Sequence, residues 1–239
     1  MNEKQKTVPN VASGEIKKDF LYDSTTVIEM KITYPIVSLE NKKIERRING
    51  MYRFTADRFF RYVSKQFYRE AVKAYQDAIR NDFPFHAFQA FLTYTETYFT
   101  DMYLSTYFDR YEYTGGAHGQ TLRFSDTWNL RTGTPQELCD FFKSRSACYK
   151  SVLREILSEA DERMKNSPGV LFDDYRKRIV KYFKPARYNL IPGGVAVYYQ
   201  QYDIAPYSSG VVTFDIPFSK LLPEKEARSE SESPDSTSN

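Results

Sequence analysis

One long helical repeat constrains the fold of this 239-residue chain more than any other feature of the sequence. From about Leu39 to Arg80, apolar side chains recur every three or four residues, and charged side chains fill the positions between them. Gly50 weakens such a helix by about 1 kcal/mol relative to alanine without ending it, and the stretch Asn81-Asp82-Phe83-Pro84 ends it. At roughly 1.5 Å per residue the helix is about 60 Å long, so it has to cross a whole sheet. Its apolar positions are Ile44, Ile48, Met51, Thr55, Phe59, Val63, Phe67, Ala71 and Tyr75.

Alternating apolar and polar residues predict strands before and after this helix. The first two strands span residues 15–22 and 25–37, and Pro35 places the second near its end or at a sheet edge. Three more strands are predicted at residues 85–99, 101–113 and 121–130. The chain contains 20 tyrosines and 18 phenylalanines, which suit half-buried sheet faces. One face of the second strand carries Ile28, Met30, Ile32, Tyr34 and Ile36.

The strand at residues 101–113 has two unlike faces. One face carries Met102, Leu104, Thr106 and Phe108, and the other carries Tyr103, Tyr107, Tyr111 and Tyr113. We expect the tyrosine face to pack under the long helix; the alternative is an aromatic ladder that stacks on a sugar or on a protein partner. On the next strand, Asp126 interrupts an apolar face made of Leu122, Phe124, Trp128 and Leu130.

The C-terminal half predicts a helical pair followed by three strands. Thr134 is a suitable N-cap for a helix that begins at Pro135, runs in one or two pieces, and ends at Ser167-Pro168-Gly169. A second helix spans about 172–181, and its cluster of Arg176, Lys177, Arg178 and Lys181 is interpreted as a solvated face. Strands follow at residues 188–191, 195–202 and 211–217, and a polar tail follows from about Pro223.

The two cysteines, Cys139 and Cys148, lie in the first of these helices. On one continuous helix they would be about 13 Å apart, which is beyond the reach of a disulfide. Only a break near residues 144–146 would let them pair. We favour ordinary reduced thiols and keep the disulfide as the alternative.

The composition argues against several classes of protein. A net charge of +3 is too small to favour a nucleic-acid partner. The chain lacks a run of about 18 apolar residues, and its first 20 residues lack the apolar core of a signal peptide, so we expect neither a membrane span nor an export signal in them. Its polar start, residues 1–13, is consistent with a linker from which an anchor has been removed.

Few residues suggest catalysis. A glycine-rich turn, Gly115-Gly116-Ala117-His118-Gly119, joins two strands and contains one of the two histidines, the other being His86. We expect His118 to fix the turn through backbone hydrogen bonds, because a general base would need an orienting partner and a nucleophile. Ser125 or Asp126 could lie near it across the hairpin. Neither histidine stands at metal-ligand spacing from other ligands, and no cofactor motif is present. The weaker alternative is a glycosidase-like carboxylate pair drawn from Glu96, Asp101, Asp109, Glu112 and Asp126.

Two segments carry a family resemblance. The first is Tyr113-Thr114-Gly115-Gly116-Ala117-His118-Gly119 with Asn129-Leu130-Arg131-Thr132-Gly133 behind it. The second is the late run Gly193-Gly194-Val195-Ala196-Val197-Tyr198-Tyr199-Gln200-Gln201-Tyr202-Asp203-Ile204-Ala205-Pro206-Tyr207-Ser208-Ser209-Gly210. Together they resemble the domain of unknown function found in RsiV-type anti-sigma factors and beside the catalytic domain of PdaC-type peptidoglycan deacetylases. The similarity covers residues 114–222, and residues 14–113 resemble the companion segment that precedes this domain.

The resemblance implies an α+β fold with antiparallel sheets on one long N-terminal helix, a C-terminal helical pair, and two interleaved subdomains at 14–113 and 114–222. Residues 1–13 and 223–239 are expected to be disordered ends. The resemblance also implies an extracytoplasmic, envelope-associated protein, and in the anti-sigma factors this domain binds lysozyme. We therefore expect a non-enzymatic binding or sensing domain for lysozyme or a cell-wall glycan, with a glycan hydrolase as the alternative. The binding residues predicted for it are Tyr103, Tyr107, Tyr111, Tyr113, His118 and Tyr207.

Overall fold

The computed structural model describes residues 9–142 and 145–221. The chain divides into two compact units, Met1–Pro135 and Gln136–Asn239. Both units combine helices with sheets, so the predicted α+β class is confirmed. Each unit is one continuous segment, whereas the sequence suggested interleaved subdomains. Within the part of the chain that the structure describes, no helix has the length and apolar character needed to cross a membrane.

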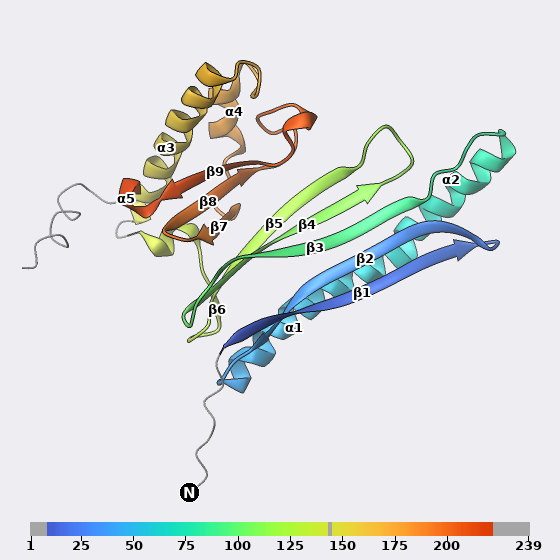
Figure 1. The fold of residues 1–239 in the computed structure, drawn as a ribbon, viewed down its shortest axis with the longest axis horizontal. Helices are drawn as coiled ribbons and strands as arrows, with labels where there is room; N and C mark the ends of the chain where they lie inside the picture. The colour runs from blue at the N-terminus through green and yellow to red at the C-terminus, as the bar shows by residue number, and fades with distance from the viewer. Residues whose placement is uncertain (1–8, 143–144, 222–239) are drawn as a thin grey trace, which may run out of the picture. The chain divides into compact units, whose positions relative to one another are not determined.

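The first unit contains a six-stranded sheet whose strands follow one another in sequence order (Figure 1). All neighbouring strands are antiparallel except β2 and β3, which are parallel. A parallel pair needs a long crossover connection, and the predicted long helix provides it. The strands are β1 (Asn10–Tyr22), β2 (Thr25–Ser38), β3 (Phe88–Phe99), β4 (Tyr103–Tyr113), β5 (Gln120–Asn129) and β6 (Thr134–Pro135).

The crossover helix is continuous but not uniform. It consists of α1 (Lys42–Tyr62), a π-helical turn η1 (Val63–Phe67) and α2 (Tyr68–Arg80). The side chain of Asn41 caps its start by accepting hydrogen bonds from the backbone of residues 43 and 44. The predicted helix is confirmed, and Gly50 does not interrupt it. The predicted buried stripe is wrong at Met51, which is 48% exposed, and at Thr55, because the chain buries Tyr52 and Ala56 there instead.

The helix covers one face of the sheet, and the core lies between them. On β4 this face carries Leu104, Thr106 and Phe108, all fully buried. The expectation that the tyrosine face packs under the helix is wrong, since the tyrosines alternate with these residues and lie on the opposite face. On β2 the predicted apolar face is buried from residue 28 to residue 34, as expected. The prediction is wrong at Ile36, which is 39% exposed, because Val37 is buried in its place.

The second unit packs helices against a three-stranded antiparallel sheet ordered β7-β8-β9. Its strands are β7 (Tyr188–Ile191), β8 (Gly194–Tyr199) and β9 (Val212–Pro217), close to their predicted positions. The helices are η2 (Leu138–Phe141), α3 (Arg145–Asn166), α4 (Tyr175–Tyr182), η3 (Tyr207–Ser209) and α5 (Phe218–Leu221). The helix predicted to begin at Pro135 is wrong at its start, because Thr134 and Pro135 form β6 with residues 128 and 129.

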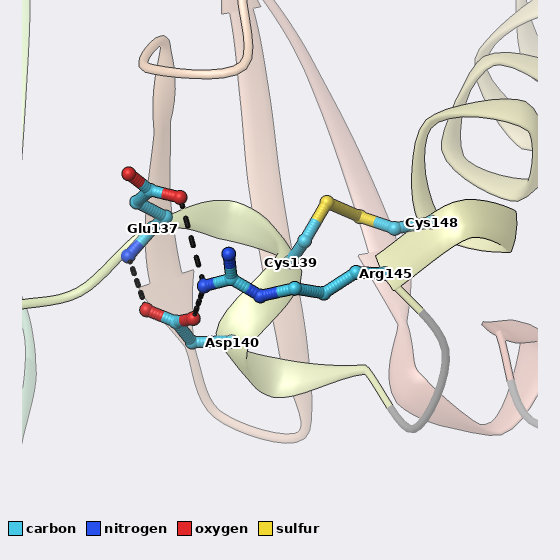
Figure 2. The surroundings of a disulfide bond; sticks show 5 residues. All are labelled: Glu137, Cys139, Asp140, Arg145 and Cys148. Atoms are coloured by element: carbon cyan, nitrogen blue, oxygen red, sulfur yellow. Dashed lines mark hydrogen bonds and ion pairs between the residues drawn. A yellow bond between two sulfur atoms is a disulfide. The ribbon is translucent and has the colours of Figure 1, made fainter.

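A disulfide between Cys139 and Cys148 joins η2 to the first turn of α3 (Figure 2). The helix breaks between these elements, so the two Cα atoms lie 5.7 Å apart and the preference for reduced thiols is wrong. Glu137 and Asp140 cap η2 reciprocally. Arg145 reaches back to both carboxylates, lying 3.6 Å from Glu137 and in contact with Asp140.

The limits of the units differ from those placed by sequence. The boundary between residues 113 and 114 falls in the turn between β4 and β5, which pair in one sheet, whereas the units meet after Pro135. The first expected disordered end is too long, because residues 10–13 belong to β1. Residues 1–8 and 223–239 lie outside the described residues.

Candidate functional site

The most site-like feature of the first unit is a cleft between α1 and the helix-facing side of β3, β4 and β5, which we name the helix–sheet cleft. It has a volume of about 500 Å³. Aromatic and aliphatic side chains form most of its wall, and two arginines stand among them. The lining residues are Thr55, Arg58, Phe59, Tyr62, Leu92, Arg110, Leu122 and Phe124. The cleft lies beside the end of α1, where the π-helical turn begins.

Arg110 sits on aromatic rings inside this cleft. Its guanidinium lies 4.5 Å from the ring centre of Tyr62 and 5.4 Å from that of Phe59. The Nε of Arg110 donates to Glu112 at 2.6 Å, and the Tyr62 hydroxyl donates to the other oxygen of that carboxylate at 3.3 Å. Burial, followed by the negative charge of Glu112, raises the pKa of Tyr62. Arg110 is therefore held in a fixed orientation.

Arg58 is the second cation of the cleft, and it is exposed. Its guanidinium lies 5.8 Å from the ring centre of Phe54, itself 51% exposed. No carboxylate of the described chain lies within ion-pair distance of Arg58. Its charge is thus available to an anionic group of a ligand.

A buried polar cluster follows on the same face of β5. Asp126 accepts hydrogen bonds from the Tyr52 hydroxyl at 2.8 Å and from the Thr106 hydroxyl at 3.1 Å. Asp126 is only half-buried by its own accessible surface, but it lies deep enough among protein atoms for burial to raise its pKa to about 6. The two hydroxyls offset part of this effect. Burial and the neighbouring Asp126 together raise the pKa of Tyr52 well above its ordinary value.

The indole of Trp128 belongs to the same cluster. The residue is 4% exposed, and its Nε1 has no partner at full hydrogen-bond geometry among the described residues. It nevertheless lies close enough to Asp126 and Tyr52 to lower the pKa of both. Asp126 thus lies among donor groups, and its protonation is coupled to the stability of the fold.

The predicted binding residues of the first unit fall elsewhere. Tyr103, Tyr107, Tyr111 and Tyr113 lie half-buried on the face of β4 opposite the helix–sheet cleft. There Tyr111 stacks on Phe91 at 5.8 Å, and Arg123 lies 3.7 Å from the ring centre of Tyr107. Asp109 holds Arg123 through two hydrogen bonds of 2.8 and 2.7 Å. A binding role for these tyrosines stays a prediction.

His118 and Tyr207 lie in different units. His118 is exposed in the turn, and its Nδ1 lies 3.2 Å from the Gly119 carbonyl oxygen. The strand register places Asp126 opposite Thr106, far from this turn, so that carboxylate does not orient the imidazole. In the second unit, Tyr207 lies in η3 with its ring 5.9 Å from that of Tyr202, a residue with a φ of 66°.

The predicted carboxylate pair does not form a recognisable catalytic centre. Asp109 is tied to Arg123, Glu112 to Arg110, and Asp101 to Arg131. Glu96 pairs with Thr106 across the sheet, and Thr106 pairs with Asp126 on the next strand. The Cα atoms of Glu96 and Asp126 are therefore two strand spacings apart, about 10 Å. Among residues 9–142 and 145–221, no group of three or more His, Cys, Asp or Glu side chains is arranged to hold a metal ion.

The sequence alone did not identify the residues of the cleft, because they come from segments that are far apart in the chain. Tyr62 and Arg110 are 48 positions apart, and only the crossover helix brings them together. One signal for the neighbouring cluster was present, since Asp126 interrupts an apolar strand face. An acid at a core-facing position indicates hydrogen-bonding partners in the core.

Two family models match the chain, one in each unit. Residues 22–121 match the model described as deacetylase PdaC, and residues 139–219 match DUF3298, a protein family of unknown function. No curated protein matches the chain. The first match falls within Met1–Pro135 and the second within Gln136–Asn239.

Two of the solved structures that share this fold are bacterial proteins. A DUF3298 family member from Bacteroides fragilis NCTC 9343 has a TM-score of 0.68 and 16% sequence identity, over 90% of this chain and 93% of its own. A DUF3298 family protein from Pseudomonas aeruginosa PAO1 has a TM-score of 0.56 and 16% identity, over 90% and 92%. The similarity establishes the fold.

Proposed function

Because this chain joins a PdaC-type domain to a DUF3298 domain of unknown function, we propose that it is a non-enzymatic binding module of the cell envelope. Its ligand is a carboxylate-bearing cell-wall glycan, held in the helix–sheet cleft of the first unit. The proposal rests on one observation: aromatic rings and an arginine without a carboxylate partner line the same cleft.

The chemistry of that wall suits an acidic sugar. Apolar faces of pyranose rings stack on partly exposed aromatic side chains such as Tyr62 and Phe124, and a guanidinium binds a carboxylate through charge-assisted hydrogen bonds. Arg110 is already paired with Glu112 and serves to orient the wall, while Arg58 supplies the available positive charge. Most of the cleft is apolar with a few convergent polar groups, which is typical of ligand sites.

The disulfide supports the envelope location. Disulfides persist in oxidising compartments and are rare in the cytosol. Both cysteines are buried and their bond ties η2 to α3, so it is structural rather than part of a thiol pair awaiting a substrate. The resemblance to envelope proteins noted above agrees with this location.

A lysozyme-like protein is the second candidate ligand, favoured by that resemblance and by the tyrosines of β4. A glycan hydrolase that uses His118 or a strand carboxylate is the third. It has less support, since the strand carboxylates Asp101, Asp109 and Glu112 are each paired with an arginine, which is not the arrangement of an acid–base pair.

Isothermal titration of the full chain tests the proposal. The ligands are soluble muropeptides, which carry carboxylates, and oligomers of N-acetylglucosamine, which do not. Arg58→Gln should weaken muropeptide binding about tenfold or more, the amount expected for one charge-assisted hydrogen bond, and should leave binding of the neutral oligomer nearly unchanged. Arg61→Gln, an exposed arginine on the same helix outside the cleft, is the matched control.

Three outcomes would count against the proposal. Absence of heat with both glycans removes the glycan as ligand, and heat with lysozyme alone favours the protein partner. Release of reducing ends from muropeptides, abolished by His118→Ala without loss of thermal stability, would establish the hydrolase instead.

A further inference from the structure

The second unit contains a groove between α3 and α4 that the proposed function does not use. It has a volume of about 700 Å³, and we name it the α3–α4 groove. Its residues come from three turns of α3 and one turn of α4, all in the same compact unit. They are Lys150, Leu153, Arg154, Leu157, Ser158, Asp161, Arg176 and Val180.

The floor of the groove is apolar and incompletely covered. Residues 148, 152, 156 and 160 of α3 are fully buried and face the interior of the unit. Leu153 and Leu157, which follow the buried residues 152 and 156 in the sequence, form a second apolar row on α3. Both are only half-buried. Across the groove, Val180 of α4 is 57% exposed, although its neighbour Ile179 is fully buried. An apolar row that its own fold leaves partly uncovered is a surface for another chain.

The rim of the groove is basic. The helix α4 carries Arg176, Lys177, Arg178 and Lys181 and contains no acidic residue. Two of these cations are neutralised, because Arg176 pairs with Asp161 and Arg178 pairs with Asp174. Arg154 pairs with Glu155 at 3.1 Å.

Two lysines beside the groove remain without an ion-pair partner. Lys150 lines it at one end, and Lys177 lies three positions before Val180, on the same side of α4. Both are exposed, and no carboxylate of the described chain lies within ion-pair distance of either. A solvated helix face explains the lysines alone, but it does not explain why they border uncovered leucine and valine side chains.

We propose that the α3–α4 groove is the docking site of an acidic amphipathic helix of a partner protein. Apolar side chains of that helix cover Leu153, Leu157 and Val180, and its carboxylates pair with Lys150 and Lys177. From Lys150 to Asp161 the groove spans about 16 Å at roughly 1.5 Å per residue. A partner helix of about three turns fits this length.

The disulfide at the first turn of α3 holds the groove in place. Cys148 is fully buried and joined to η2 by the disulfide, and Arg145 contacts the two carboxylates that cap η2 (Figure 2). The helix that carries Lys150 and the two leucines is thus anchored at its start. A rigid surface binds a helix with less loss of conformational entropy than a mobile one.

The chain's own tail is the competing occupant, because residues 223–239 contain five acidic residues and two basic ones. Ala227 is its single apolar side chain other than proline. The charge of the tail therefore complements the basic rim of the groove, but the tail lacks the apolar side chains needed to cover its floor. This mismatch favours an outside partner.

A synthetic peptide tests the proposal on the full chain by fluorescence anisotropy. The fluorescein-labelled probe has about 14 residues. Its leucines are two helical turns apart, so that they lie on one face of the helix, and most other positions are glutamate. We expect Lys150→Glu combined with Lys177→Glu to weaken binding about tenfold or more, and Val180→Asp to do the same. Lys165→Glu, an exposed lysine of α3 outside the groove, is the matched control and should change binding less than about twofold.

Thermal unfolding of each variant shows whether it is folded, since all the replaced side chains are exposed. The proposal is overturned if a peptide of the same composition with scattered leucines binds equally well, or if Val180→Asp has no effect. Neutralising the five acidic residues of the tail should leave probe affinity unchanged; a large gain would identify the tail as the occupant. Equal binding of anionic phosphatidylglycerol vesicles, with the same dependence on Val180, would identify a lipid surface instead.

Discussion

Replacing Asp126 by asparagine should make the first unit more stable near neutral pH and leave its stability near pH 4 almost unchanged. Asparagine keeps an oxygen that accepts from the Tyr52 and Thr106 hydroxyls, but it carries no charge to desolvate. Burial raises the pKa of Asp126 from 3.8 to about 6, so the folded state favours the protonated acid.

The magnitude follows from that shift. A group whose pKa is raised on folding contributes stability that is complete below its unfolded pKa and is lost as the pH rises through its folded pKa. A shift of about 2 pKa units corresponds to about 3 kcal/mol. Between about pH 4 and pH 7.5 the wild-type chain should therefore lose about 2–3 kcal/mol relative to Asp126→Asn.

Urea unfolding at several pH values measures this difference, followed by the fluorescence of Trp128, the single tryptophan of the chain and a neighbour of Asp126. Tyr52→Phe provides a variant with the opposite effect. The Tyr52 hydroxyl lowers the pKa of Asp126 by stabilising the charged carboxylate, so its removal raises that pKa further. It should destabilise the first unit more at pH 7.5 than at pH 4. If the difference between the wild type and Asp126→Asn is the same at both pH values, the reasoning is refuted.

Three further changes separate backbone geometry from packing. Gly50→Ala should stabilise the first unit by about 0.5–1 kcal/mol in urea unfolding, because the added Cβ meets no atom within 4 Å on an exposed helical turn. Gly194→Ala should destabilise the second unit by about 2 kcal/mol or more, since its Cβ would lie 2.4 Å from the backbone oxygen of Ile216; near-UV circular dichroism reports the loss of its packing. Replacing Cys139 and Cys148 together by serine should cost about 2–3 kcal/mol, the value expected for a closed loop of this length, and reduction of the wild type should reproduce the loss in the same unfolding assay.

Local patterns predict the elements of this fold but not their arrangement. The helical repeat from Ile44 to Ala71 and the alternation in β2 and β4 depend on neighbours a few residues away, so a single sequence contains them. The parallel pairing of β2 with β3 joins residues 60 positions apart, such as Ile28 and Phe88. No local pattern distinguishes this pairing from an antiparallel one.

The same limit explains the candidate sites. The helix–sheet cleft depends on the register that places Arg110 under Tyr62, and the α3–α4 groove depends on how closely two helices pack. Sequence identified the basic residues of α4 as a solvated face, and three of the four are exposed. It could not place them beside Leu153 and Leu157, because these leucines belong to a different helix. The disulfide was only the alternative for a related reason, since η2 and α3 together resemble one helical pattern.

The crossover between β2 and β3 has a consequence for the order in which the first unit is built. The hairpin of β1 and β2 is complete after Ser38, but its apolar face has no cover until the 39-residue helical segment ending at Arg80 has followed. If the chain emerges from a secretion channel one end first, this hairpin spends the interval with Ile28, Met30 and Ile32 in water. Charged residues along the outer strand β1, such as Lys17, Lys18 and Asp19, would then hinder the association of two nascent hairpins.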